Sequence, residues 1–177
     1  RHIDYRHLVM SPVNRPPIAQ PIVAQKLPYY FTKEAIDQIL PLLDHPSNKI
    51  QWRAMSALST IARHHTKLLF ENVSQLIEIM NAGSVITKDH GVKIMLCLYE
   101  NPSYQNTIGV LLNEQILQAP DNQLGQYAEK WSKRIDSNDL GALIRSLETR
   151  QSDLHNPSHQ KRISKILKKL YKTANIK

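Results

Sequence analysis

Apolar residues recur at a fixed spacing over residues 32–99 of the chain. Five apolar positions within residues 36–43 are apolar again 37 residues later, without a gap. The first set is Ile36, Ile39, Leu40, Leu42 and Leu43, and the second is Val73, Leu76, Ile77, Ile79 and Met80. Within each set the spacing is that of an amphipathic helix. Repetition at one period of this length predicts stacked helical hairpins.

The second helix of each predicted hairpin follows the same shift into a third copy. Its small and apolar positions are Ala54, Leu58 and Ile61, then Gly91, Met95 and Leu98, then Ala128 and Ile135. Turn residues such as Asn, Pro and Gly separate the periodic segments. The pattern predicts eight helices in four antiparallel pairs. We expect them at about residues 32–43, 48–64, 67–81, 86–100, 104–117, 123–135, 138–149 and 158–173.

The first 31 residues differ from the rest because they hold five of the ten prolines. Proline lacks the backbone N–H and disfavours helix in the residue before it, so no long helix can pass through. We therefore divide the chain into a Pro-rich arm, residues 1–31, and a repeat domain, residues 32–177, with Thr32 as the first N-cap. The apolar residues of the arm favour packing on the first hairpin, and a disordered linker is the alternative.

The second helix of the first hairpin resembles a HEAT repeat, the armadillo-type class of helical repeat. The resemblance rests on Ile50, Arg53, Ala54, Leu58 and Ile61, and it extends over about residues 32–173. The second copy departs from it, with Thr87 and Gly91 where Ile and Ala are expected. The resemblance implies an all-α fold, an α–α superhelix (right-handed solenoid) of about four hairpins. It also implies that the second helices line the concave face.

Charge is unevenly distributed along the chain. The formal net charge is +8, and residues 145–177 hold nine basic residues against two acidic ones. On the second helices, the side opposite the apolar stripe carries many of these cations. The candidate binding residues on that side are Trp52, Arg63, Lys93, Lys130, Lys133, Lys161, Lys165, Lys168 and Lys172. Clustered lysines attract phosphates or acidic proteins. The alternative is a solvated polar cap on the last repeat.

Catalytic and metal chemistry find little support in the sequence. The pair His64 and His65 is adjacent, so on a helix the two side chains diverge, and no His-Glu-x-x-His motif is present. The single cysteine, Cys97, excludes an internal disulfide and a thiolate zinc site, and we expect it to be buried. We expect no metal, no cofactor and no catalytic residues. No apolar run reaches the length of a membrane span.

The sequence therefore favours a non-catalytic scaffold, cytoplasmic, that binds a protein or other acidic partner on its concave face. Nucleic acid is a second kind of partner that the charge permits, and nothing indicates the oligomeric state. Some DNA-alkylation-repair glycosylases are built of HEAT-like repeats and use Trp, Asp and Arg around an extruded base. Trp52 and Asp89 occupy equivalent positions of adjacent repeats, so a relative of these enzymes is the alternative function. For Trp52 itself, the other interpretation is packing or plain surface exposure. Because the chain begins at Arg1, we expect a fragment or a processed form.

Overall fold

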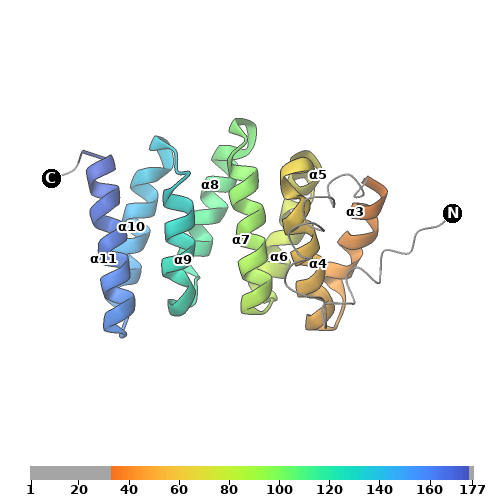
Figure 1. Cartoon of the computed structure of the whole chain (residues 1–177), viewed down its shortest axis with the longest axis horizontal. Helices are drawn as coiled ribbons and strands as arrows, with labels where there is room; N and C mark the ends of the chain where they lie inside the picture. Colours follow the sequence, from red (N-terminus) through yellow and green to blue (C-terminus); the bar gives the residue numbers. More distant parts are fainter. Residues whose placement is uncertain (1–32, 176–177) are drawn as a thin grey trace, which may run out of the picture. The chain divides into compact units, whose positions relative to one another are not determined.

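The computed structural model describes residues 33–175, and helices joined by short turns make up this range (Figure 1). No strand is present between residues 33 and 175, which confirms the predicted all-α class. The predicted arm, residues 1–31, and the predicted N-cap Thr32 lie outside the described residues. In chain order the helices are α3 (Lys33–Ile39), η1 (Leu40–Asp44), α4 (Asn48–Ile61), η2 (Ala62–His64), α5 (Thr66–Glu71), α6 (Val73–Ala82), α7 (Val85–Tyr99), α8 (Pro102–Leu117), α9 (Asp121–Ser132), α10 (Ser137–Asp153) and α11 (Pro157–Thr173).

The chain forms two compact units that meet in the sequence after Leu98. The first unit contains α3 to α6 and all of α7 but its last residue, and the second begins at Tyr99 and contains α8 to α11. Each unit has a core of its own, with side chains such as Leu58 in the first and Leu147 in the second fully buried. The register predicted from the 37-residue period is confirmed in both, because Ala54 and Ala128 are both 0% exposed.

In the first unit, the helix predicted for residues 32–43 changes from α to 3₁₀ geometry at Leu40. Pro41 has no N–H to donate to the carbonyl of Asp37, and its ring crowds that carbonyl. The last turn therefore tightens into η1. This 3₁₀ turn still packs against α4, and it buries Leu40 and Leu43 as the apolar pattern predicts.

The helix predicted for residues 67–81 is interrupted at Asn72, which separates α5 from α6. The backbone of Asn72 leaves the helical region, with φ −107° and ψ 17°. Its side-chain Nδ2 donates a hydrogen bond of 2.8 Å to the carbonyl of Leu68. Asn side chains compete with the backbone in this way, which explains the break at a position where the apolar period alone predicts continuity.

The second unit has two layers of helices. Helix α8 packs against α10 in one layer, α9 packs against α11 in the other, and the turns connect α8 to α9 and α10 to α11 (Figure 1). Asparagine or aspartate caps three of these helices. The side chains of Asn101, Asp136 and Asn156 accept hydrogen bonds from the first turns of α8, α10 and α11 respectively. These caps satisfy N–H groups that have no partner within the helix.

Two helix ends in the second unit differ from the sequence prediction. Helix α9 ends at Ser132 rather than near residue 135, because the chain turns there towards Asp136, the N-cap of α10. Helix α10 continues to Asp153 rather than ending near residue 149. The following Leu154 is buried and Pro157 begins α11, so the turn is confined to the few residues between them.

A hydrogen-bond network around the hydroxyl group of Tyr99 joins the start of the second unit to α10. The hydroxyl donates to Asp139 over 2.7 Å and accepts from the backbone N–H of Asp136 over 2.9 Å. The ring meets Trp131 edge to face, with 6.0 Å between centroids. Gly109 on α8 leaves room for the Asp139 carboxylate, because a Cβ at this position would lie 2.4 Å from Oδ2. Burial and the Asp139 hydrogen bond together raise the pKa of Tyr99 to about 12.

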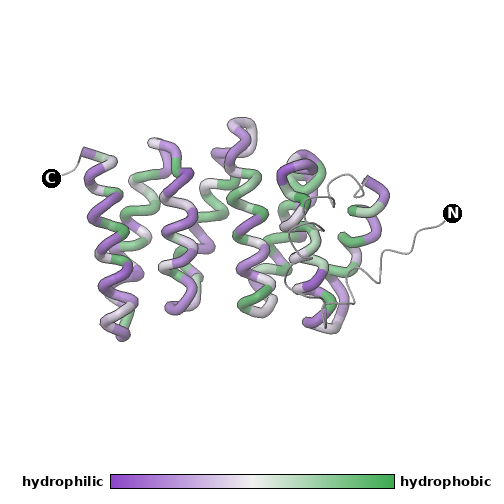
Figure 2. Tube along the Cα trace, viewed as in Figure 1, coloured by the Kyte–Doolittle hydropathy of each residue, from purple (hydrophilic) through white to green (hydrophobic). Residues whose placement is uncertain are grey.

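Helix α11 closes the second unit with a strongly amphipathic sequence. Hydrophilic positions predominate along its trace in Figure 2. Its buried side chains are Ile163, Ile166, Leu167 and Leu170. They lie on the side that packs against α9 and α10, so the charged positions are left on the solvent side. This arrangement is the one predicted from the sequence for residues 158–173.

Candidate binding surface

In the first unit, the predicted binding residues lie on α4 (Trp52), on the following 3₁₀ turn η2 (Arg63) and on α7 (Lys93). Arg63 and Lys93 are exposed, whereas Trp52 is half-buried. The guanidinium carbon of Arg53 lies 5.5 Å from the centroid of the Trp52 ring, so this neighbour already covers part of the indole through a cation–π contact. That contact favours the packing interpretation of Trp52.

Helices α4 and α7 also contact each other directly. Ser59 Oγ and His90 Nδ1 are 3.1 Å apart. Ser59 donates its own hydroxyl hydrogen to the carbonyl of Ser56 over 2.8 Å. The Ser59 oxygen is therefore an acceptor for a neutral or charged histidine rather than a nucleophile that His90 deprotonates. The pair is a polar link between neighbouring second helices.

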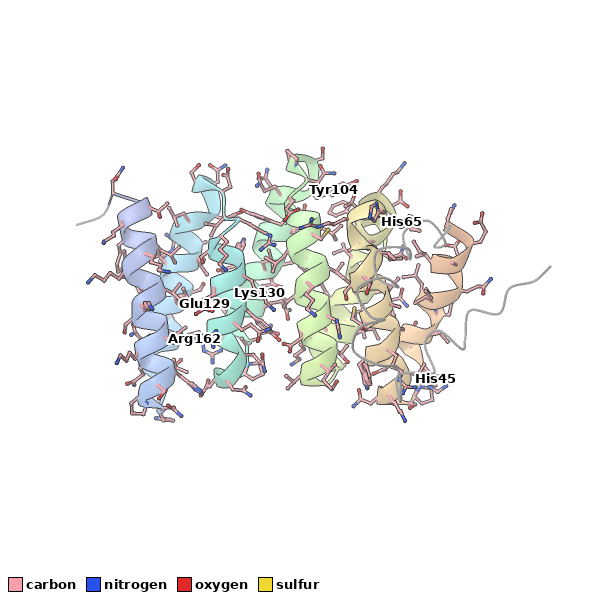
Figure 3. The ribbon with its side chains drawn as sticks, in the orientation of Figure 1. His45, His65, Tyr104, Glu129, Lys130 and Arg162 are labelled. Carbon is pink, nitrogen blue, oxygen red and sulfur yellow. The ribbon has the colours of Figure 1, made fainter. Side chains whose placement is uncertain are left out.

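In the second unit, an ion pair links the second helices α9 and α11. Arg162 Nε and Nη2 donate to the two carboxylate oxygens of Glu129 over 2.9 and 2.7 Å (Figure 3). Gly125, one turn before Glu129, leaves the space that this geometry requires. A Cβ at Gly125 would lie 2.6 Å from Arg162 Cδ, so the glycine lets the arginine lie flat across α9. Bidentate pairing of this kind fixes orientation as well as charge.

A cleft between α9 and α11, here named the α9–α11 cleft, adjoins this ion pair. Its volume is about 480 Å³, and the lining combines cations with a nonpolar floor. The lining residues are Glu129, Ser132, Lys133, Lys165, Ile166, Lys169, Leu170 and Thr173. Its three lysines are exposed, whereas Ile166 and Leu170 are buried. The structure thus brings together two predicted binding residues, Lys133 and Lys165.

Two other predicted residues of α11 belong to a different depression. Lys168 and Lys172 line a cleft of about 360 Å³ on the α10 side of the helix, together with Gln151, Ser164, Leu167 and Tyr171. Gln151 Nε2 donates to Ser164 Oγ and closes one wall of it. The predicted basic face of α11 is therefore divided by its two neighbours. Lys161 is exposed and lines neither cleft, and Lys130 is half-buried on α9 (Figure 3).

The sequence prediction did not include Lys169 among the binding residues. It lies four residues after Lys165, so both side chains project from one face of α11. The repeat register relates Trp52 to Lys161 and Arg63 to Lys172, and it does not lead to Lys169. The i, i+4 spacing of Lys165 and Lys169 indicates that they share a face of α11. Only the position of α9 shows that this face lines a cleft.

The electrostatics of the α9–α11 cleft are dominated by its cations. The hydrogen bonds from Arg162 are the largest cause that lowers the pKa of Glu129; burial opposes them, and the charges of Arg162, Lys133 and Lys169 add to the lowering. The same pairing raises the pKa of Arg162. Glu129 therefore stays ionised near neutral pH, and Arg162 occupies both of its oxygens. No ion pair joins Lys133, Lys165 or Lys169 to another residue within the described part of the chain.

Metal-binding clusters and membrane-spanning helices are absent from residues 33–175. Between residues 33 and 175, no group of three or more His, Cys, Asp and Glu side chains could hold a metal ion. His64 and His65 line a shallow cleft with Lys33 and Lys67 in the first unit. Cys97 is half-buried rather than buried as expected. None of the described helices has both the length and the nonpolar character that crossing a bilayer requires.

Hairpins of antiparallel helices with a shared register define the protein as an all-α helical-repeat protein. The family model described as armadillo-like matches residues 48–122, from the start of α4 to the start of α9. No curated protein and no solved structure matches the chain. The matched segment and the helical hairpins are together consistent with an armadillo/HEAT-like helical-repeat protein.

Proposed function

We propose that the protein is a non-catalytic scaffold that binds an acidic segment of a protein partner on the face formed by the second helices of its hairpins. This face is the concave one in the HEAT-repeat resemblance. Repeat proteins use such extended surfaces for binding. The second unit supplies the observation that carries the proposal.

That observation is the composition of the α9–α11 cleft. Three exposed lysines surround a floor made of Ile166 and Leu170. An acidic peptide matches both properties, because carboxylates can approach the lysine ammonium groups while an apolar side chain rests on the floor. Interfaces gain stability from a nonpolar centre with a polar rim, and charge complementarity raises the association rate.

Two features favour a protein partner over nucleic acid. No aromatic residue lines the α9–α11 cleft, so unpaired bases would lack a stacking surface there. The Glu129 carboxylate also lies in the lining, where it would repel a continuous phosphate backbone. A discrete acidic side chain can avoid that carboxylate by binding among the lysines.

The resolved pKa shifts favour binding over catalysis. Burial raises the pKa of Tyr99 to about 12, and the hydrogen bond to Glu148 raises the pKa of Tyr171. The pKa of Glu129 is lowered and that of Arg162 is raised. All four shifts move away from neutral pH, whereas a general acid or base works best with a pKa near the operating pH.

A competition between probes tests the proposed function. We expect a fluorescein-labelled glutamate-rich peptide to bind the full chain at low ionic strength, and its affinity to fall as salt is added. The variant Lys133→Glu/Lys165→Glu should weaken binding by roughly tenfold or more. The control Lys67→Glu/Arg145→Glu changes the net charge equally on exposed first-helix positions of α5 and α10. It should change the affinity by less than about threefold.

Equal losses in the two double variants would show that binding follows net charge rather than this face. Duplex DNA and single-stranded RNA serve as alternative probes in the same titration. Tighter binding of either one than of the peptide, with the same sensitivity to Lys133→Glu/Lys165→Glu, would contradict the protein-partner proposal.

A further inference from the structure

The α9–α11 cleft concentrates three ammonium groups from two helices. Lys165 and Lys169 project from the same face of α11, one turn apart, and Lys133 follows the last turn of α9 on the facing side. The electrostatic effect on Glu129 is consistent with this proximity, because Lys133 and Lys169 both act on that one carboxylate. Three like charges around one small cleft repel each other, and a bound anion removes that repulsion.

The hydroxyl groups of the lining cannot supply the hydrogen bonds to such an anion. Ser132 Oγ donates to the carbonyl of Glu129 over 3.1 Å, and Thr173 Oγ1 donates to the carbonyl of Lys169 over 3.2 Å. Their hydrogens are already engaged. The donors that remain in the cleft are the lysine ammonium groups, each of which has three N–H bonds.

The number of donors indicates the charge and shape of the anion. A carboxylate carries one negative charge and two oxygens, and the cleft already holds one such group, paired with Arg162. A phosphate ester carries nearly two negative charges and three strongly accepting oxygens at neutral pH. A phosphate ester can offer each of the three lysines its own oxygen for a charge-assisted hydrogen bond, and it matches more of their charge than a carboxylate does.

We infer that the α9–α11 cleft binds a phosphorylated side chain of the partner segment, with Lys133, Lys165 and Lys169 as its ligands. This inference rests on the proposed function and specifies the chemistry of the partner. The nonpolar floor adds a second requirement, because Ile166 and Leu170 lie beside the cations. The preferred segment has an apolar residue next to the phosphorylated one.

The test compares three labelled peptides that share one sequence with a central Ser-Leu. One carries phosphoserine, one carries serine and one carries glutamate at the central position. Fluorescence anisotropy with the full chain measures each affinity. We expect the phosphopeptide to bind roughly tenfold more tightly than the glutamate peptide, because it gains at least one charge-assisted hydrogen bond.

The helix provides a closely matched control for the location of the site. Lys165→Ala/Lys169→Ala and Lys168→Ala/Lys172→Ala remove the same charge from exposed positions of α11 that line two separate clefts. The first should weaken phosphopeptide binding by roughly tenfold or more, and the second by less than about threefold. Circular dichroism and thermal melting verify that both variants keep the fold of the parent.

Several results would overturn the inference, and they differ in whether the proposed acidic-partner function survives. If the glutamate peptide binds as tightly as the phosphopeptide, or both double variants lose affinity equally, the phosphate site is excluded while the acidic-partner function remains. If none of the three peptides binds at low ionic strength, the proposed function fails as well. Binding of phosphatidylserine vesicles in preference to the phosphopeptide, with selective loss in Lys165→Ala/Lys169→Ala, would assign the cleft to a membrane surface instead.

Discussion

Two polar links hold parts of the second unit together, and they are built in opposite ways. The first is the Tyr99 network, in which a fully buried ring places its hydroxyl between Asp136 and Asp139. The second is the pair between Arg162 and Glu129, whose side chains are 42% and 44% exposed. Both cross between helices, but only the first is shielded from water.

The difference in exposure assigns the two links different roles. A buried hydrogen-bonded group is costly to leave without its partner, so the Tyr99 network contributes to the free energy of folding. An exposed ion pair contributes little, because water and salt screen it. The Arg162–Glu129 pair instead arranges the charges of the α9–α11 cleft. Stability and binding are thus carried by different links in the same unit, and substitutions should separate them.

The largest expected effect comes from removing the aromatic partner of Tyr99. Trp131 is 1% exposed and meets the Tyr99 ring edge to face. Trp131→Ala leaves a cavity and should lower the free energy of unfolding by about 3–5 kcal/mol. Chemical denaturation followed by circular dichroism measures the change. Trp131→Phe retains much of the ring volume and should cost less, and equal stability of Trp131→Ala and the parent would refute a structural role for this contact.

A smaller loss is expected when only the hydroxyl group of Tyr99 is removed. Tyr99→Phe retains the ring but leaves the Asp139 carboxylate and the Asp136 N–H without this partner. The free energy of unfolding should fall by about 1–3 kcal/mol. A double-mutant cycle with Asp139→Ala isolates the pair, and additive losses in the cycle would mean that the two groups do not interact.

The same hydroxyl predicts a dependence of stability on alkaline pH. The pKa of Tyr99 is about 12 in the folded protein and about 10 when unfolded. Between these values the unfolded chain loses the proton that the folded chain keeps, so stability falls as pH rises from about 10 to about 12. Denaturation of the parent and Tyr99→Phe across this range should show the steeper fall in the parent. Parallel curves would contradict the raised pKa.

The apolar period predicted the helices and their buried faces well. Ala54 and Ala128 are buried because the shift of 37 residues records the stacking of similar hairpins. Departures occur where one side chain overrides the period. Asn72 breaks a helix by binding the carbonyl of Leu68, and Pro41 tightens another into a 3₁₀ turn. A hydrophobic pattern does not show such local changes in backbone hydrogen bonding.

The candidate site was less predictable, because it depends on which helices are neighbours. The register placed Lys165 and Lys168 on one solvent side, but α9 and α10 assign them to separate clefts. The role of Gly125 likewise depends on tertiary packing. Its missing Cβ matters only because Arg162 crosses it. A sequence period shows which face of a helix is exposed, and the packing decides which exposed residues act together.

The smallest effect on stability is expected at the exposed link, together with a change in binding. Glu129→Gln removes the carboxylate that Arg162 holds and should change the free energy of unfolding by less than about 1 kcal/mol. The lowered pKa of Glu129 gives the sign of its pH dependence. The parent should lose this small contribution as pH falls through the folded pKa, and Glu129→Gln should not.

The affinity for the peptide should rise in Glu129→Gln even though its stability changes little or falls. Without the Glu129 charge, the α9–α11 cleft loses its one anion and Arg162 becomes available to a ligand, so the glutamate-rich peptide should bind several-fold more tightly at low ionic strength. Glu148→Gln is the matched control, because it removes an equal charge from α10, where the carboxylate accepts from Tyr171 outside this cleft. Tighter binding in both variants would indicate a general charge effect. Weaker binding in Glu129→Gln would mean that the pair with Arg162 holds the cleft in its binding shape, and the separation of stability from binding argued for the two links would fail.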